Sequence, residues 1–217
     1  MKEFEFTGCF EVKELLGFKA DDELKLMELI EEVPADSIYY HMHSYFLRHF
    51  YIVEPFPNDF ANWAAVQVRD KVLGEKLSSV TPWQTSDLEV IRGQLVEIID
   101  DHLSRIKAVP SVAYGTPFHF MMSRIIEVPT GVVATNLEEF LEAIKTVDAS
   151  AIYNHIFEAR LREKKGKSDF ALWFEDVLGR KELADKIERM DSYMFSLEGL
   201  RDKIADLCRE ELSHAGR

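Results

Sequence analysis

The chain carries the sequence ADSIYYH at Ala35–His41, and a related sequence, ASAIYNH, lies 114 residues further along at Ala149–His155. With the offset shortened to 110, DFANW at Asp59–Trp63 corresponds to DFALW at Asp169–Trp173. Matching positions keep the same order through most of both halves, and identical Tyr, His, Asp, Phe and Trp residues recur, which shared helical periodicity alone does not produce. The sequence therefore predicts two copies of one unit.

This repeat predicts how the chain divides into domains. We assign residues 1–107 to a first helical repeat, residues 108–117 to a linker, and residues 118–217 to a second helical repeat. Two prolines and a glycine in the linker interrupt any helix there. The two repeats could still pack as one compact domain, because 217 residues are compatible with one domain or two.

Most of each unit shows the pattern of amphipathic helices with short polar residues at their starts. Two segments differ, because aromatic and β-branched residues there surround turn residues. The predicted fold class is mainly α, with two pseudosymmetric helical lobes and with short extended or β segments near residues 4–12 and 118–133. The FxF sequences in these segments, Phe4–Phe6 and Phe118–Phe120, are predicted to pair as a small sheet or clasp.

Composition limits the classes of partner. The chain has 26 Lys and Arg against 39 Asp and Glu, a net charge of -13, which disfavours binding to nucleic acid or to anionic membranes. No segment approaches the roughly 18 apolar residues of a membrane span, and Met1–Phe6 does not resemble a signal peptide. Cys9 and Cys208 are too few for a disulfide framework, which favours the cytoplasm. We expect a monomer or homodimer with a protein partner or a small polar or anionic ligand.

The recurring polar and aromatic residues are the candidates for a site. A carboxylate bonded to one histidine nitrogen fixes the tautomer and leaves the other nitrogen for proton transfer, so His41 with Asp59, or His155 with Asp169, is a candidate acid-base pair. The alternative is structural: each Asp caps a helix, each Trp fills the core, and each His satisfies a buried hydrogen bond. The candidate ligand-binding residues are Tyr39, His41, His43, Asp59, Trp63, Tyr153, His155, Asp169, Trp173 and Arg162.

Neither metal nor cofactor is predicted. Histidines at positions 41, 43 and 49 invite a metal interpretation, but on a helix residues two apart point about 200° apart and residues eight apart lie about 12 Å apart. The basic run over residues 160–167, which contains Arg162, precedes a predicted helix start. It could hold a phosphate or carboxylate there, or it could be a solvated helix end.

The run SIYYHMH at Ser37–His43, followed by NDFANW at Asn58–Trp63, resembles an uncharacterised family of bacterial and archaeal proteins described as a domain of unknown function. The second copy carries the same pattern in weaker form. The resemblance implies a prokaryotic cytoplasmic protein and supplies no activity. We therefore expect a non-catalytic accessory protein, helical and binding a ligand or protein, with an enzyme that uses a His-Asp pair on a small polar substrate as the alternative.

Overall fold

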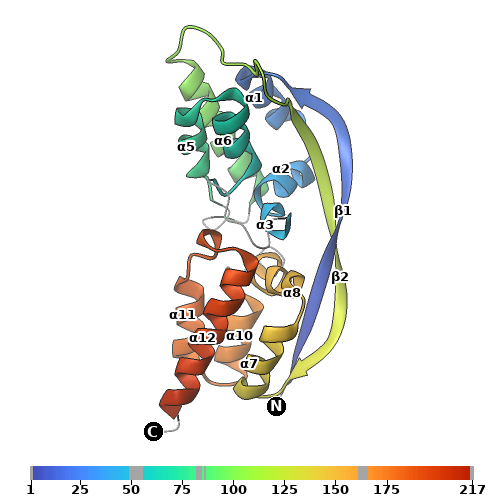
Figure 1. The fold of residues 1–217 in the computed structure, drawn as a ribbon, viewed down its shortest axis with the longest axis vertical. Helices are drawn as coiled ribbons and strands as arrows, with labels where there is room; N and C mark the ends of the chain where they lie inside the picture. The colour runs from blue at the N-terminus through green and yellow to red at the C-terminus, as the bar shows by residue number, and fades with distance from the viewer. Residues whose placement is uncertain (1, 49–55, 82–84, 86, 161–165, 216–217) are drawn as a thin grey trace. The chain divides into compact units, whose positions relative to one another are not determined.

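The computed structural model describes residues 2–48, 56–81, 85, 87–160 and 166–215. It contains two long strands and a series of short and medium helices (Figure 1). The strands are β1 (Phe4–Ala20) and β2 (Phe118–Ala134). After β1 come α1 (Glu23–Glu32), α2 (Ala35–Met42), α3 (Tyr45–Arg48), α4 (Asp59–Trp63), the π-helical turn η1 (Ala64–Val68), α5 (Lys71–Ser78) and α6 (Leu88–Leu103). After β2 come α7 (Leu137–Thr146), α8 (Ala149–Tyr153), the π-helical turn η2 (Asn154–Glu158), α10 (Asp169–Asp176), α11 (Lys181–Arg189), η3 (Ser192–Met194) and α12 (Leu197–Ala215).

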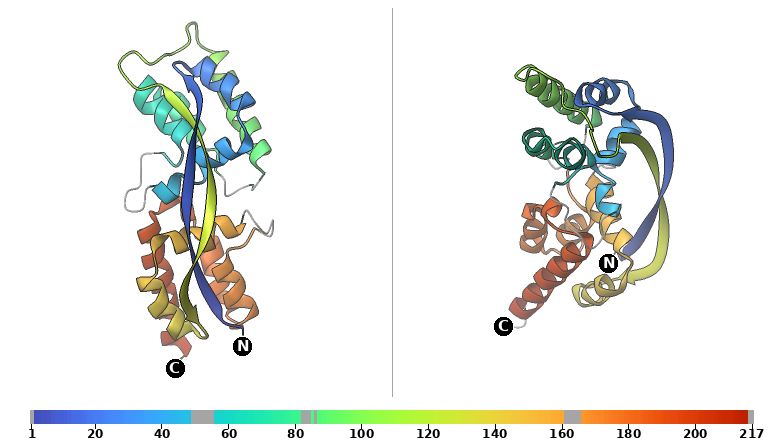
Figure 2. Two further views of the ribbon diagram at one scale, coloured as in Figure 1. Left: turned by 90° about the vertical axis from the view of Figure 1, so that its right-hand side faces the viewer. Right: turned by 45° about the horizontal axis from the view of Figure 1, so that its top comes forward.

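The predicted fold class, mainly α with short β segments near residues 4–12 and 118–133, is wrong. The protein is mixed α/β, although mainly helical, because β1 and β2 each run for 17 residues and pair as a two-stranded antiparallel sheet (Figure 2). The length of the strands was underestimated from the sequence because each contains a glycine that is typical of a turn. Gly17 and Gly131 lie within the strands with φ of 80° and 75°. Glycine adopts a positive φ without steric cost, so the strand can continue through it, and the turn residues Pro129, Thr130 and Gly131 lie inside β2.

By compactness the described residues form two units, which we treat separately. The α1–α6 unit comprises residues 11–48 and 56–124, and the α7–α12 unit comprises residues 2–10 and 125–215. The α1–α6 unit therefore contains the first residues of β2, the strand that precedes α7 in the sequence. The α7–α12 unit contains the first residues of β1, the strand that precedes α1. The division predicted from the sequence, at residues 108–117, concerns the repeat and stays a prediction.

The first residues of β2 pack into the core of the α1–α6 unit, and those of β1 pack into the core of the α7–α12 unit. In the α1–α6 unit, Phe118 and Phe120 are buried together with Phe60, and the Phe60 and Phe118 rings stack at 5.1 Å. In the α7–α12 unit, Phe4 and Phe6 are buried against residues of α7 and α10 that include Phe140 and Phe170. Large aromatic side chains contribute most of the apolar area in such a core, so these FxF sequences anchor the strand ends.

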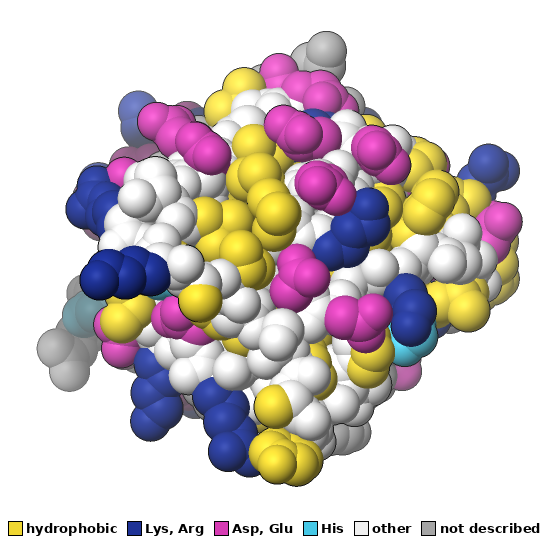
Figure 3. Space-filling model, turned by 90° about the horizontal axis from the view of Figure 1, so that it is seen from above, with side chains coloured by type: hydrophobic (Ala, Val, Ile, Leu, Met, Phe, Trp, Pro, Cys, Tyr) yellow, Lys and Arg dark blue, Asp and Glu magenta, His cyan; other side chains and the backbone are white. Residues whose placement is uncertain are grey.

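The excess of Asp and Glu over Lys and Arg in the composition is visible on the surface. On the face drawn in Figure 3, hydrophobic side chains are interspersed with many Asp and Glu side chains. None of the helices in the described ranges is both long enough and apolar enough to cross a membrane.

Candidate functional site

In the α1–α6 unit, His41 links two helices to a strand. Its Nδ1 lies 2.8 Å from Oδ2 of Asp59, and its Nε2 accepts a hydrogen bond of 3.1 Å from the backbone N–H of Met121 in β2. Because Nε2 is an acceptor, the single ring proton is on Nδ1, which donates to Asp59. Arg48 donates to the same carboxylate oxygen at 2.7 Å. Both nitrogens of the ring are therefore occupied.

The α7–α12 unit repeats this arrangement at the corresponding positions. Nδ1 of His155 lies 2.8 Å from Oδ2 of Asp169, and Nε2 accepts a hydrogen bond of 2.9 Å from the backbone N–H of Thr7 in β1. Thr7 stands 114 residues before Met121, so the equivalent strand residue is bound in each case. The side chain of Asn154 completes the contact by donating to the carbonyl of Thr7 at 3.1 Å. We call each His, Asp and strand amide a latch.

Burial sets the protonation of the first latch. It lowers the pKa of His41 below the usual range, and the hydrogen bond to Asp59 offsets this only in part, so the ring is neutral. Burial also disfavours ionisation of Asp59, but the hydrogen bond from His41 and the charge of Arg48 outweigh it and lower the pKa of that carboxyl. The latch is thus a neutral imidazole that donates to a carboxylate.

The aspartates do not cap their helices, which corrects the structural interpretation drawn from the sequence. The N-caps are the preceding residues: Asn58 accepts from the N–H of Ala61 at 2.8 Å, and Ser168 accepts from that of Ala171 at 3.3 Å. Each cap starts the helix one residue before the aspartate and leaves the carboxylate free to bond the histidine.

The two candidate tryptophans also hold strand ends. Trp63 donates through its indole N–H to the carbonyl of Thr116 at 2.9 Å, and Trp173 donates to that of Lys2 at 3.0 Å. Thr116 and Lys2 again differ by 114 positions. Both indoles are 5% exposed, as expected for core residues with a satisfied N–H.

The remaining aromatic candidates form one stacked pair in each unit. Tyr39 stacks on His43 with ring centroids 5.5 Å apart, and Tyr153 stacks on Phe157 at the same distance. His43 is 1% exposed, and both of its ring nitrogens lack a hydrogen-bond partner among the described residues. Burial lowers the pKa of His43 to about 3, so this ring is neutral and acts as an aromatic side chain.

Arg162 lies outside the described residues. The described ends of its basic run are paired with carboxylates: Arg160 with Glu188 at 3.0 Å, and Lys167 with Glu175 at 2.5 Å. Both described basic residues are therefore held by ion pairs within the α7–α12 unit.

A pocket of about 540 Å³ opens beside the latch of the α7–α12 unit. His155, Asp169 and Trp173 reach its wall, together with Lys2, Glu3, Phe4, Glu5, Leu172, Asp176 and Val177. Four of these residues are acidic and one is a lysine, so the pocket is negative. At the positions that the predicted repeat aligns with Glu3, Glu5 and Asp176, the α1–α6 unit has Pro117, His119 and Val66, which lack the negative charge.

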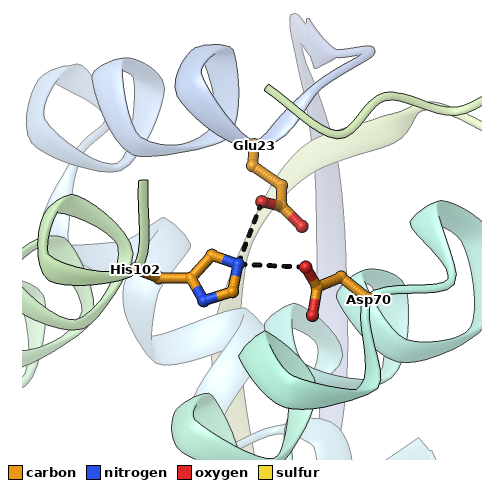
Figure 4. A group of neighbouring side chains, drawn as sticks. All are labelled: Glu23, Asp70 and His102. Carbon is orange, nitrogen blue, oxygen red and sulfur yellow. Dashed lines mark hydrogen bonds and ion pairs between the residues drawn. The ribbon is translucent and has the colours of Figure 1, made fainter. Parts of the chain in front are cut away.

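Sequence reasoning missed a second group, in the α1–α6 unit. Glu23 begins α1, Asp70 caps α5, and His102 lies near the end of α6; both carboxylates point at the same ring nitrogen of His102 (Figure 4). Nε2 of His102 lies 2.9 Å from Oδ2 of Asp70 and 3.8 Å from Oε2 of Glu23. Burial, reinforced by the charges of Asp70 and Asp22, raises the pKa of Glu23 to about 8. The available signal was a glutamate at a position that the predicted repeat aligns with the apolar Leu137.

Comparison with known proteins supplies a family and a fold. A family model described as a family of unknown function (DUF5752) matches residues 1–209. No curated protein matches the chain. The solved structure of OrfY from Thermoproteus tenax superposes with a TM-score of 0.79 at 22% identity, covering 96% of this chain and 95% of that one. At this identity the likeness shows the fold alone.

Proposed function

We propose the function from the site itself, because this chain belongs to DUF5752, a family of unknown function that supplies no activity to inherit. The proposal is a non-catalytic cytoplasmic binding protein built from two copies of one unit, in which the α7–α12 unit takes a small polar ligand in its acidic pocket. One observation supports the non-catalytic part of the proposal: in both latches, both ring nitrogens of the histidine form hydrogen bonds to other residues of the fold.

An acid-base catalyst must present a nitrogen or a carboxylate to its substrate. The nitrogen that Asp169 leaves available on His155 accepts the amide of Thr7 instead, and its ring is 5% exposed. Proton transfer would require breaking that bond and leaving a buried amide without a partner, which costs about 1–3 kcal/mol. This geometry supports binding over the alternative that the histidine and aspartate form a catalytic pair.

The charges around the pocket indicate the ligand. The carboxylates of Glu3, Glu5, Asp169 and Asp176 outnumber the single ammonium of Lys2, so an anion is the least favoured of the ligands predicted from the sequence. Phe4 and Trp173 also line the pocket, and aromatic rings attract an organic cation through their faces. We therefore propose a small polar ligand that carries an amine. The two buried free thiols, Cys9 and Cys208, fit a reducing cytoplasm.

The test is a titration of the full chain with three four-carbon probes: 1,4-diaminobutane, erythritol and succinate. We expect the diamine to raise the melting temperature and quench tryptophan fluorescence, the polyol to act more weakly, and the dicarboxylate to have no effect. Glu5→His and Asp176→Val, which introduce the residues of the other copy, should each weaken diamine binding at least about tenfold, the effect of one lost charge contact. Asp36→Asn, an exposed change in the other unit, is the matched control.

Two results would contradict the proposal. If succinate binds and the diamine does not, the charge argument fails. If a substrate is turned over and His155→Ala abolishes turnover while the melting temperature stays unchanged, the enzyme alternative replaces the binding protein.

A further inference from the structure

We propose that Glu23, Asp70 and His102 form a binding site for a first-row divalent cation, of which zinc is the best fit, within the α1–α6 unit. The three side chains come from the start of α1, the start of α5 and the end of α6 (Figure 4). One ligand atom from each residue lies within 4.8 Å of the other two.

The state of Glu23 is the first indication of a bound cation. Its side chain is 0% exposed, and neither carboxylate oxygen has a hydrogen-bond partner among the described residues. Burying a carboxylate without a partner lowers the stability of the fold, and proteins normally pair such a group or use it to hold a metal. The carboxylate faces His102 and Asp70 (Figure 4), so the group that it binds must lie among these three side chains.

The corresponding positions in the α7–α12 unit give the second indication. The positions of Glu23, Asp70 and His102 correspond to Leu137, Arg180 and Glu211 in the other copy, at the same places in α7, α11 and α12.

There Arg180 and Glu211 form an ion pair of 3.1 Å beside an apolar residue, so positive and negative charges balance. In the α1–α6 unit two carboxylates meet one imidazole, and no described Lys or Arg forms an ion pair with Glu23 or Asp70. A bound cation supplies the positive charge that Arg180 supplies in the other copy.

The distances between the three side chains also fit a zinc ion. Zinc binds histidine nitrogen and carboxylate oxygen at about 2.0–2.2 Å, so neighbouring ligand atoms of a tetrahedral ion lie about 3.3–3.5 Å apart. The distances from Nε2 of His102, 2.9 Å to Asp70 and 3.8 Å to Glu23, bracket that value. A small rotation of each carboxylate suffices. Mixed nitrogen and oxygen ligands suit zinc and its neighbours, whereas magnesium and calcium prefer oxygen alone.

Asp70 has a second role that fixes its position. Its Oδ1 accepts from the N–H of Leu73 at 2.9 Å and caps α5, while Oδ2 faces the site. One oxygen thus holds the carboxylate rigidly and the other is directed at the ligand. Such support from outside the coordination sphere is what orients metal ligands in proteins.

The experiment uses the full chain, stripped with a chelator and desalted. Zn²⁺, Mn²⁺ or Mg²⁺ is then added; bound metal is counted by mass spectrometry, and unfolding is followed by thermal shift. We expect one tightly bound Zn²⁺ per chain, a rise of at least about 5 °C in melting temperature, weaker binding of Mn²⁺ and no response to Mg²⁺.

Variants separate this site from adventitious binding. Glu23→Gln keeps the shape of the side chain and should weaken Zn²⁺ binding at least about 100-fold, since loss of an outer partner alone costs 10- to 100-fold. His119→Ala removes an exposed histidine outside the site and should change nothing. If Glu23→Gln fails to fold, the triple variant Glu23→Leu, Asp70→Arg, His102→Glu, which installs the residues of the other copy, replaces it.

The proposal is overturned if the wild-type chain binds no stoichiometric Zn²⁺, which would leave a proton as the sole partner of Glu23. It is equally overturned if the Glu23 variants bind Zn²⁺ as tightly as the wild type, or if His119→Ala abolishes binding. These outcomes do not depend on the diamine pocket of the other unit.

Discussion

In the α1–α6 unit His41 accepts the amide of Met121, and in the α7–α12 unit His155 accepts that of Thr7, with the aspartate bond of 2.8 Å identical in both. Around these latches the two units diverge. One buries a glutamate beside Asp70 and His102, and the other has acidic residues around an open pocket. The residues that bind the strands are thus shared, and the differences lie at the two places where we propose that each unit binds a ligand of its own.

The largest effect should come from breaking a latch. His41→Ala and His155→Ala each remove two hydrogen bonds and leave a hole among aromatic rings, so each should lower the free energy of unfolding by about 3 kcal/mol. The two losses should agree closely because the two geometries agree. Urea denaturation checks this, with His119→Ala as the control. A latch variant that unfolds like the wild type would show that its histidine is not structural.

Exchanging the buried residues at the start of α1 and α7 should have the next largest effect. In the presence of a chelator, Glu23→Leu removes a buried, unpartnered carboxylate and should raise the free energy of unfolding by about 2 kcal/mol. Leu137→Glu should lower it by a similar amount. Denaturation with the chelator present measures both. If both substitutions change the free energy of unfolding by equal and small amounts, the surroundings of Glu23 and Leu137 do not differ in charge balance.

Acid should separate the two stacked pairs. The folded pKa of His43 is about 3, below the value of about 6.5 for an unfolded histidine, so the unfolded state binds the proton first as pH falls through this window. The free energy of unfolding should therefore decrease by up to about 1.4 kcal/mol for each pH unit below 6.5.

His43→Phe installs the residue of the other copy, Phe157, and should remove this part of the acid sensitivity. The measurement is the difference between wild type and variant in urea denaturation at pH 7 and at pH 5. A difference that does not change with pH would place the titration elsewhere.

The smallest effects concern the glycines inside the strands. Gly17→Ala and Gly131→Ala should each lower the free energy of unfolding by about 1 kcal/mol, because a φ near 80° is unfavourable for alanine. An added Cβ meets no other atom at either position, so the backbone conformation is the sole cause. Gly93→Ala, in α6, is the control and should stabilise the protein slightly. Thermal unfolding distinguishes these outcomes. A stabilised Gly17 variant would argue against a positive φ at this position.

Much of the helical structure could be predicted, because caps and apolar spacing act locally. The helices expected to begin at Asp59 and Asp169 are present, with the residue before each aspartate as the N-cap. The strands were underestimated because each contains a glycine that interrupts its alternating pattern. Which helices each strand joins depends on contacts more than 100 residues apart, such as Trp173 with Lys2, and nothing in the local sequence encodes them.

The candidate site was predicted unevenly for the same reason. His41 with Asp59, and His155 with Asp169, lie together as the repeat suggested, because both residues recur at matching positions. The group at Glu23 was overlooked because its residues do not recur. Recurrence reveals the residues that the two units share, whereas a buried carboxyl group in one unit appears only where their sequences differ.

The most direct test of this account is an anomalous difference map at the zinc edge from crystals of the full chain grown with Zn²⁺. The account predicts a peak about 2.0–2.2 Å from a carboxylate oxygen of Glu23, Oδ2 of Asp70 and Nε2 of His102. It predicts no peak beside Arg180 and Glu211. A map without a peak at the first position, or with peaks of equal height at both, would contradict it.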